Sequence, residues 1–279
     1  MQLINGTVLA DTIKQQVAHD VQTLPEQPRL GVLLVGDDPA SHLYVRLKRE
    51  AAERAGIALD IRLCDASISD DELVACINAW NADPHTHAIL VQLPLPAGHD
   101  ETRVIGAIDP VKDVDGFHVA HLAAWETGTA SIIPPVHEGV LRLINATDTP
   151  VNLARVTIIA NSEIFAKPLA HLLKTAGAFV SVMSADALDP ATLRESDIVI
   201  TAVGKPGLIT SPMVKNTVVL IDVGTTKLPN GKVVGDVDRD SFIHTEAWIS
   251  PVPGGVGPMT IAQLLMNVVR LCRAQTASS

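Results

Sequence analysis

Residues 29 to 48 read RLGVLLVGDDPASHLYVRLK and contain a complete strand, loop and helix pattern. The run RLGVLLVG at 29 to 36 is almost wholly apolar, which is typical of a strand that is buried on both faces. Asp38 and Pro39 then supply a helix N-cap and a first helical residue, and Gly56 supplies a stop. A buried strand that leads directly into a helix predicts a β–α unit of a parallel sheet.

The same alternation of apolar runs and helical patterns continues on both sides of this unit. Residues 8–23, 70–82, 167–176 and 260–274, together with PPVHEGVLRLINA from about Ser131, have the spacing or caps of helices; Ser69 is the expected cap of the second. Strands are expected at 59–63, 87–93, 155–161, 179–183, 197–203 and 218–223. Strands that alternate with helices predict an α/β fold with mainly parallel sheets, which receive ligands at the carboxyl ends of their strands.

A fresh alternation after about residue 131 indicates two domains. We expect the first domain to span 1–130 and to include the final helix at 260–279, whose apolar face could pack back on it. The second domain, at 131–259, would then have a Rossmann-type sheet.

Composition limits the class of function. The chain has 279 residues, 47% of them hydrophobic, and a formal net charge of -10, which argues against a nucleic-acid partner. The N-terminus lacks the pattern of a signal peptide, and no apolar run reaches membrane-spanning length. The three cysteines are far apart and suit free thiols in a reducing compartment. We therefore expect a cytoplasmic protein that contacts neither nucleic acid nor membrane.

Lys48 is the first candidate for chemistry. The apolar residues of its helix, Ala40, Leu43, Tyr44, Leu47, Ala51 and Ala55, recur at helical spacing, and Lys48 falls at the edge of this face. An amine that is partly shielded from solvent has a lowered pKa and can accept a proton near neutral pH. Tyr44, the only tyrosine, would lie on the same side of the helix and could cover a flat heteroaromatic ring. The plainer interpretations are a lysine that extends into water and a core aromatic.

Polar residues also follow the expected strands. Gln92 stands alone among the apolar residues of VQLPLP, and Asp115 in KDVDGF could accept two N–H bonds from an aminopyrimidinone ring, with Gly116 allowing a sharp turn. Alternatively, Asp113 and Asp115 could cap the next helix. The glycines of PVPGGVGPMT at 251–260 would let a flat ligand or a pyrophosphate approach the backbone, although a plain loop could have the same composition.

Other common sites find little support. His118 and His121 could share a helical face, but no third ligand occurs at metal spacing, so solvated histidines are the favoured interpretation and no metal is expected. The motifs of serine hydrolases, HExxH zinc enzymes and P-loop proteins do not occur.

The motifs YVRLK, VQLPLP, KDVDGFH, VGKPG, IDVG, GKVVGDV and PVPGGVGPMT occur in this order and cover nearly the whole chain. Together they resemble the bifunctional methylenetetrahydrofolate dehydrogenase/methenyltetrahydrofolate cyclohydrolase family. The resemblance implies two α/β domains flanking a cleft, a homodimer, tetrahydrofolate derivatives as substrates and a role in one-carbon metabolism and purine biosynthesis.

The same resemblance assigns roles to individual residues. Lys48 would be the catalytic lysine, Tyr44 would stack on the pterin, Gln92 would hold and tune the lysine, and Asp115 would bind the pteridine ring. Further residues that would line the folate cleft are Val91, Leu93, Pro253, Gly254 and Gly257. The dinucleotide, NADP in the family, would meet Ser162, Gly204, Gly224, Thr225 and Thr260.

The expected cofactor loop departs from the family pattern GRSxxVGxP. Ala160 and Ala166 replace its glycines, and Asn161 replaces the arginine that the family uses against the 2′-phosphate of NADP. VMSADAL replaces CHSxT, so that Asp186 could accept from an unphosphorylated ribose and favour NAD, or could be a polar turn residue. PPVHEG at 134–139 replaces PCTPxG.

Three hypotheses follow from these observations. The first is the bifunctional enzyme, using NADP or, because of its loop, NAD. The second is a folate-binding paralogue that keeps cyclohydrolase activity alone or only the ligand site. The third, a Rossmann dehydrogenase for an unrelated small substrate, would make the folate motifs coincidental.

Overall fold

The computed structural model describes residues 1–127 and 132–277. The chain folds into two compact units. We call residues 11–135 with 261–279 the three-stranded unit, and residues 1–10 with 136–260 the six-stranded unit, after their main sheets. The domain boundary expected at 130/131 falls outside the described residues.

The three-stranded unit is built on a parallel sheet. Its central strand β2 (Arg29–Val35) lies between β3 (Ala58–Cys64) and β4 (Ala88–Val91), and both neighbours run parallel to it. All of β2 after Arg29 is buried, as the apolar run predicts. Because β2 and β4 are parallel neighbours in this sheet, their carboxyl ends are adjacent.

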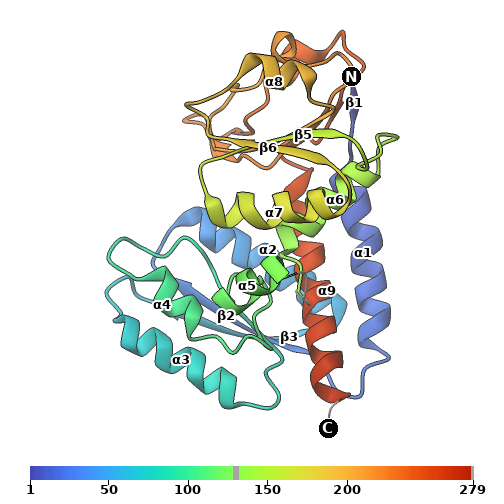
Figure 1. Ribbon diagram of the computed structural model, residues 1–279. Coiled ribbons are helices and arrows are strands. Elements are labelled where there is room, and N and C mark those ends of the chain that lie inside the picture. Colours follow the sequence, from blue (N-terminus) through green and yellow to red (C-terminus); the bar gives the residue numbers. More distant parts are fainter. Residues whose placement is uncertain (128–131, 278–279) are drawn as a thin grey trace. The chain divides into compact units, whose positions relative to one another are not determined.

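The helices of this unit begin and end where local signals predict. In α2 (Pro39–Ala55), the Asp38 carboxylate accepts from the Ser41 N–H, and Gly56 ends the helix with φ 79°. In α3 (Asp70–Ala82), Ser69 and Glu72 form a reciprocal capping box. The other helices with residues in the unit are α1 (Gly6–Val21), α4 (Glu101–Gly106), α5 (Val119–Thr127) and α9 (Val256–Thr276), all visible in Figure 1.

The final helix joins the core of the first domain, as expected. Leu264, Leu265, Val268 and Val269 of α9 share one buried cluster with Leu30 and Val32 of β2 and Val45 of α2. The segment 261–279 accordingly belongs to the three-stranded unit.

The predicted apolar face of α2 is wrong in its phase. Leu43 and Leu47 are 43% and 37% exposed, whereas Ser41, Val45, Ala52 and Ala55 are buried. Small side chains let the helix approach the sheet closely, and Ser41 is satisfied in this position because its hydroxyl donates to Asp38. Since Lys48 falls three residues after Val45 and four before Ala52, it shares the buried side of the helix.

The six-stranded unit contains a fully parallel sheet in the order β1-β11-β8-β7-β5-β6. Its strands are β1 (Gln2–Leu3), β5 (Arg155–Ala160), β6 (Phe179–Met183), β7 (Ile198–Ala202), β8 (Val219–Asp222) and β11 (Trp248–Ile249). A small antiparallel pair joins β9 (Thr226–Lys227) to β10 (Val233–Val234). The first residues, expected in the first domain, add β1 to this sheet; a strand of two residues is too short to leave a periodic pattern.

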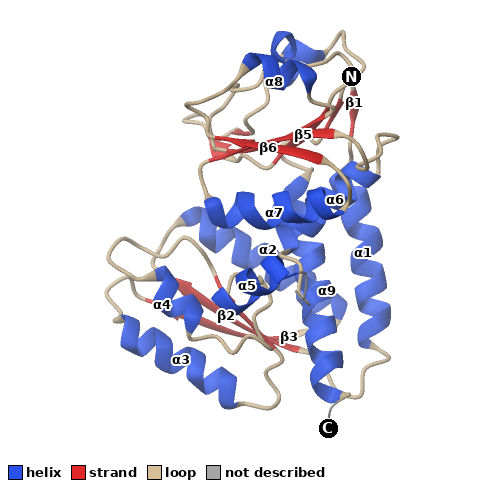
Figure 2. Ribbon diagram, viewed as in Figure 1, coloured by secondary structure: helices blue, strands red, loops and turns tan. Residues whose placement is uncertain are grey.

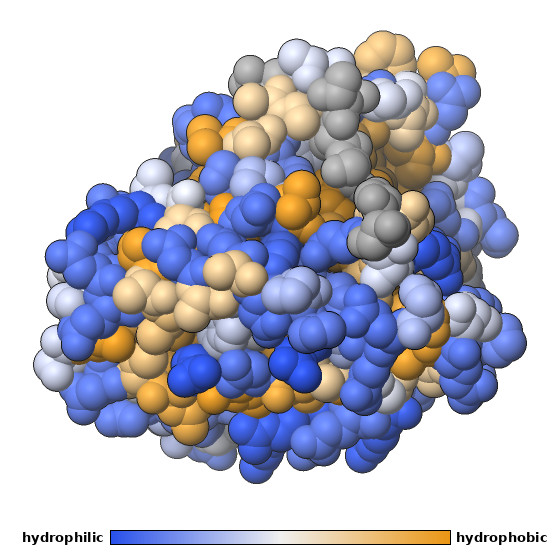
Figure 3. All heavy atoms as spheres, turned by 90° about the horizontal axis from the view of Figure 1, so that it is seen from below, coloured by the Kyte–Doolittle hydropathy of each residue, from blue (hydrophilic) through white to orange (hydrophobic). Residues whose placement is uncertain are grey.

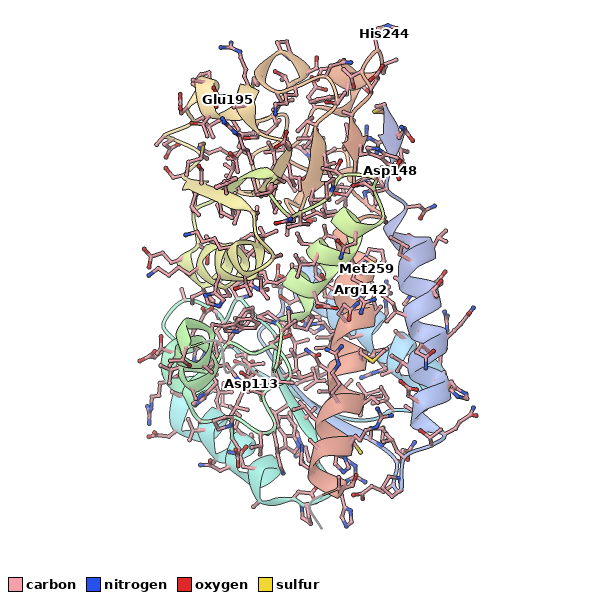
Figure 4. The ribbon with its side chains drawn as sticks, turned by 45° about the vertical axis from the view of Figure 1, so that its right-hand side comes forward. Asp113, Arg142, Asp148, Glu195, His244 and Met259 are labelled. Atoms are coloured by element: carbon pink, nitrogen blue, oxygen red, sulfur yellow. The ribbon has the colours of Figure 1, made fainter. Side chains whose placement is uncertain are left out.

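Helices and short 3₁₀ turns complete the six-stranded unit (Figure 2). They are α6 (Pro135–Asn145), α7 (Glu163–Thr175), α8 (Pro190–Glu195) and the turns Ser211–Met213 and Arg239–Phe242. Residues Gly139 of α6 and Met259 of α9 lie close together, since a Cβ on Gly139 would lie 3.1 Å from the Met259 Cβ. Figure 4 shows Met259 beside α6. The strand order reverses between β5 and β7, so that a ligand is expected to bind after Ala160 and Ala202.

The surface and the cysteines agree with the composition. In the view of Figure 3, hydrophilic residues cover much of the face shown, with smaller hydrophobic areas between them. Within residues 1–127 and 132–277, no helix has the length and apolar character that a membrane crossing requires. Cys64, Cys76 and Cys272 are free thiols.

Candidate active site

Lys48 and Gln92 meet at the carboxyl edge of the three-stranded sheet. The Lys48 Nζ donates to the Gln92 Oε1 at 2.9 Å. The orientation of the Gln92 amide is fixed because its Nε2 donates to the Leu93 carbonyl at 2.7 Å and its backbone N–H donates to Leu33 at 2.8 Å. The amide therefore presents only an acceptor to the lysine, and it holds the amine without giving it a proton.

Asp115 is the charged partner of this amine. Burial lowers the pKa of Lys48, and the nearby Asp115 carboxylate partly offsets that shift. Burial raises the pKa of Asp115 to about 6, against the opposing effect of Lys48. Each group thus makes the charged form of the other less costly, and the amine is closer to neutrality at physiological pH than an exposed lysine would be.

The loop that carries Asp115 is held from both sides. Asp113, labelled in Figure 4, accepts from the backbone N–H groups of Asp115, Gly116 and His118 at 3.2, 3.0 and 2.8 Å. Gly116 turns the chain with φ +71°. Of the two aspartates that could have capped the following segment, Asp113 binds these backbone donors, and Asp115 is left to interact with Lys48.

Two residues that the sequence analysis missed anchor this loop. The Lys112 Nζ donates to the carbonyls of Trp80, Asn81 and Asp83 at 3.0, 2.9 and 2.8 Å, and so closes the C-terminus of α3. The Asn267 amide donates to the Val114 carbonyl at 3.1 Å. Both side chains are nearly fully buried and therefore need hydrogen-bond partners. Because these partners are backbone carbonyls, which every residue has, the sequence does not predict the contacts.

The other predicted substrate residues of this unit lie beside the same edge. Tyr44 is half-buried on α2, one helical turn before Lys48. Val91 is 5% exposed and belongs to the core cluster under β4, against which Leu93 packs. A planar ring beside an amine, a carboxylate and an oriented amide could bind a flat heterocycle and transfer a proton at it.

The start of α7 is a candidate anion site in the six-stranded unit. Ser162 occupies the N-cap position, but its side chain makes no capping hydrogen bond. The first-turn N–H groups of this 13-residue helix can therefore meet a pyrophosphate. Glu163, whose charge would oppose an anion, forms an ion pair with Lys167 at 2.6 Å.

The two alanines of this loop do not fill the site. Ala160 and Ala166 are 7% and 5% exposed, so their Cβ atoms are packed in the interior. Within the described residues, Leu153 is the only non-glycine with positive φ, so neither alanine is forced into a conformation that requires glycine. Both alanines are therefore accommodated without backbone strain, and the residues present fit a dinucleotide.

The remaining predicted dinucleotide residues lie after β7 and β8 and in α9. Gly204 has φ +77° and its carbonyl accepts from Thr226. Gly224 and Thr225 follow β8 directly. Thr260 lies in the first turns of α9, where its hydroxyl donates to the Val256 carbonyl.

The loop before α9 and the first turn of α9 contain the predicted folate-cleft residues of the six-stranded unit. Gly254 has φ +104° and its carbonyl accepts from the Thr7 N–H at 3.1 Å. Pro253 precedes it, and Gly257 has no atom within 4 Å of a built Cβ. The backbone at Gly257 is thus open on the side where a side chain would project.

Two departures from the family pattern touch each other. His137 of PPVHEG and Phe165 of the cofactor loop have ring centroids 5.0 Å apart at an interplanar angle of 59°. His137 is fully buried, and burial lowers its pKa to about 4. These two positions, at which the chain differs from the motifs PCTPxG and GRSxxVGxP, therefore contact each other.

The histidines considered for a metal have other partners. His121 is buried with its Nε2 at 2.9 Å from the Pro110 carbonyl, and the His118 Nδ1 accepts from the Ala120 N–H. Across the part of the chain that the structure describes, His, Cys, Asp and Glu side chains form no cluster suited to a metal ion. Of the two, His121 is not the solvated histidine that we expected.

Comparisons with known proteins cover both units of the chain. A family model of the tetrahydrofolate dehydrogenase/cyclohydrolase catalytic domain matches residues 4–115, and a model of the NAD(P)-binding domain of the same family matches residues 134–276. A bifunctional protein FolD from Polynucleobacter necessarius is 43% identical over 272 residues, which are 96% of each chain.

Two solved structures are similar over almost their whole length. The bifunctional enzyme FolD, a methylenetetrahydrofolate dehydrogenase/cyclohydrolase from Campylobacter jejuni, has a TM-score of 0.94 and 39% identity, with coverage of 98% of this chain and 99% of that one. The Trypanosoma brucei enzyme, solved with NADP and an inhibitor, has a TM-score of 0.93 and 30% identity over 98% of both chains. The chain belongs to the tetrahydrofolate dehydrogenase/cyclohydrolase family.

Proposed function

We propose that the protein oxidises 5,10-methylenetetrahydrofolate to 5,10-methenyltetrahydrofolate with a nicotinamide dinucleotide, and hydrolyses the product to 10-formyltetrahydrofolate. The observation that carries this proposal is the hydrogen bond from Lys48 to an oriented Gln92, beside the buried Asp115. The family membership supports both activities.

Hydrolysis requires a base, because water must lose a proton as it attacks the methenyl carbon. Lys48 provides this base: its lowered pKa makes the neutral amine accessible, and one N–H remains directed at Gln92 while the lone pair accepts the proton. Asp115 would accept from the N–H groups of the pteridine ring, and Tyr44 would cover the face of the ring. These contacts fix the reacting carbon relative to the amine.

Oxidation requires a hydride acceptor, which the bound dinucleotide supplies. The first turn of α7 with Ser162 would hold its pyrophosphate, and the loops that contain Gly204, Gly224 and Thr225 would hold the remainder. The buried positions of Ala160 and Ala166 support retention of this site.

NAD is the dinucleotide that the chain's own residues favour over NADP. Asn161 carries no charge, and its side-chain oxygen accepts from the Ala185 N–H at 3.3 Å. Asp186 follows β6 with an exposed carboxylate, the place from which an acidic residue binds ribose hydroxyls. Lys205, 2.7 Å from Asp186, is neutralised by it and is a poor partner for a 2′-phosphate.

The edge strand β6 supports a homodimer. Phe179 and Val182 are 63% and 51% exposed on this edge. Leu153 is 68% exposed, and its N–H donates to the Gly177 carbonyl just before β6. Exposed apolar residues on an unpaired strand favour pairing with another chain, here a second copy. The free cysteines support a location in the reducing cytoplasm, where the formyl product would serve purine biosynthesis.

Both reactions can be tested by absorbance. Purified protein is incubated with methylenetetrahydrofolate and either NAD or NADP, and separately with methenyltetrahydrofolate. We expect reduction of the dinucleotide and hydrolysis. Hydrolysis without reduction of either dinucleotide would reject the dehydrogenase and leave the cyclohydrolase paralogue.

The role of Lys48 needs a variant of similar shape without the amine. Lys48→Met should abolish hydrolysis while folate still binds, since only the proton acceptor is lost. Lys14→Met is the matched control, because Lys14 forms an exposed ion pair with Asp11 on α1. A fully active Lys48→Met protein would refute the assigned role.

A further inference from the structure

Two buried aspartates lie in neighbouring loops of the six-stranded unit. Asp222 is the last residue of β8, and Asp236 follows β10; they are 3% and 0% exposed. Among the described residues, neither carboxylate forms an ion pair with a lysine, arginine or histidine. Their charges are met by hydrogen-bond donors of the surrounding loops.

Asp236 binds the loop after β7. Its Oδ2 accepts from the Thr201 hydroxyl and the Val203 N–H, both at 2.8 Å, and its Oδ1 accepts from the Lys205 N–H at 2.8 Å. These three donors lie on both sides of Gly204. The carboxylate therefore determines the course of the chain through Gly204.

Asp222 binds the segment that carries Asp236. Its Oδ1 accepts from the Asp236 N–H at 3.0 Å and its Oδ2 from the Val237 N–H at 2.9 Å. A Cβ on Gly235 would lie 2.0 Å from Asp222, and a Cβ on Gly224 would lie 2.3 Å from Asp236. Each carboxylate thus occupies the space beside a glycine of the neighbouring loop, and the three loops are locked to one another.

We propose that Asp222 and Asp236 are positioning residues for dinucleotide binding, which set the loops after β7 and β8 in their binding conformation. The inference rests on the proposed function. These loops lie at the carboxyl ends of β7 and β8, where parallel α/β sheets receive ligands.

A purely structural role would not require this chemistry. Burying two carboxylates is costly, and apolar residues of similar volume often stabilise a fold as well or better. The cost is visible in Asp222, whose pKa is raised to about 6 by burial and by Asp236. What the carboxylates add is a fixed orientation of backbone N–H groups, and so a loop of defined shape.

The test compares the two ends of the same sheet. Asp222→Asn and Asp236→Asn each replace one accepting oxygen by a donor that faces an N–H group. Asp197→Asn is the control: Asp197, which is partly exposed and paired with Lys215, also accepts a backbone N–H, from Arg155 at 2.8 Å, but it directly precedes β7 at the amino end of the strands. Dinucleotide Kd, dinucleotide KM and cyclohydrolase rate are measured for each full-length protein.

We expect Asp222→Asn and Asp236→Asn to raise Kd and KM for both NAD and NADP by about tenfold or more, through lost charge-assisted hydrogen bonds. The ratio between the two dinucleotides and the cyclohydrolase rate should remain as in the wild type. Asp197→Asn should leave dinucleotide affinity unchanged. Wild-type affinity in both loop variants, or an equal loss in Asp197→Asn, would overturn the inference.

A milder variant keeps the test decisive if the asparagine variants do not fold. Thr201→Val removes one donor to Asp236 and keeps the side-chain shape, so it should raise dinucleotide KM severalfold and spare hydrolysis. An unchanged KM would count against the inference. A wild-type protein that hydrolyses methenyltetrahydrofolate but binds neither dinucleotide would reject the proposed dehydrogenase itself, a result distinct from any difference among variants.

Discussion

Gln92 should set the pH at which Lys48 acts as a base, and two substitutions should move that pH in opposite directions. The Gln92 Oε1 accepts from the Lys48 Nζ at 2.9 Å and stabilises the ammonium more than the amine. A hydrogen bond to a charged group contributes about 1 to 1.5 kcal/mol more than one to a neutral group. Gln92→Leu should therefore lower the pKa of Lys48 by about one unit.

Gln92→Glu should have the opposite effect. A carboxylate near the ammonium contributes up to about 4 kcal/mol of attraction at 4 Å, less the cost of burying it, and should raise the pKa of Lys48 by roughly two units. The base is active only when deprotonated, so the acid limb of the hydrolysis rate should move to lower pH in Gln92→Leu and to higher pH in Gln92→Glu.

The assay is the hydrolysis rate of methenyltetrahydrofolate as a function of pH, corrected for the uncatalysed reaction. Gln92→Leu should also lose about tenfold in maximal rate, because the amine is no longer held in place. Gln92→Glu should be slower than the wild type at pH 7 and recover as pH rises. Acid limbs that shift in the same direction in both variants, or not at all, would refute the view that this amide tunes the lysine.

Three further predictions concern the six-stranded unit. The pKa of His137 is about 4 when folded and about 6.5 when unfolded, so the unfolded chain takes up the proton first and stability falls as pH drops below 6.5. His137→Phe should abolish a loss of about 2 kcal/mol in unfolding free energy between pH 7 and pH 5, measured by urea unfolding; an unchanged loss would contradict the burial argument. Asp186→Ala should raise KM for NAD about tenfold and lower it for NADP, and kinetics that keep the wild-type preference would exclude Asp186 from ribose recognition. Phe179→Lys should convert the proposed dimer into a monomer in analytical ultracentrifugation, and a dimer that persists in this variant would place the interface elsewhere.

The sequence predicts elements well where the signal is local. Ser69 and Glu72 lie within one turn of each other, and α3 has the bounds that their capping box implies. The strand at 179–183 is likewise predicted to the residue. The phase of α2 is not local: Leu43 and Leu47 are as apolar as a core requires, and only the packing of small residues against the sheet turns them outward.

The same distinction applies to the site. Lys48, Gln92 and Asp115 could be selected because each is a polar residue in an apolar or turn context. Asp222 and Asp236 lie in the motifs IDVG and GKVVGDV, but their role could not be predicted, because their partners are mostly backbone N–H groups brought together by folding. A carboxylate that binds backbone is, in sequence, indistinguishable from a surface residue.

The distribution of the departures explains how cofactor choice could change without loss of hydrolysis. Asn161, Phe165 and His137 belong to the six-stranded unit, whereas Lys48 and its partners Gln92 and Asp115 belong to the three-stranded unit. Among the residues that the structure describes, the hydrogen bonds that hold Lys48 and the Asp115 loop come from the three-stranded unit. Substitutions in the dinucleotide loop therefore leave the base, its orienting amide and its carboxylate intact, and selection on the dinucleotide can act independently of the cyclohydrolase.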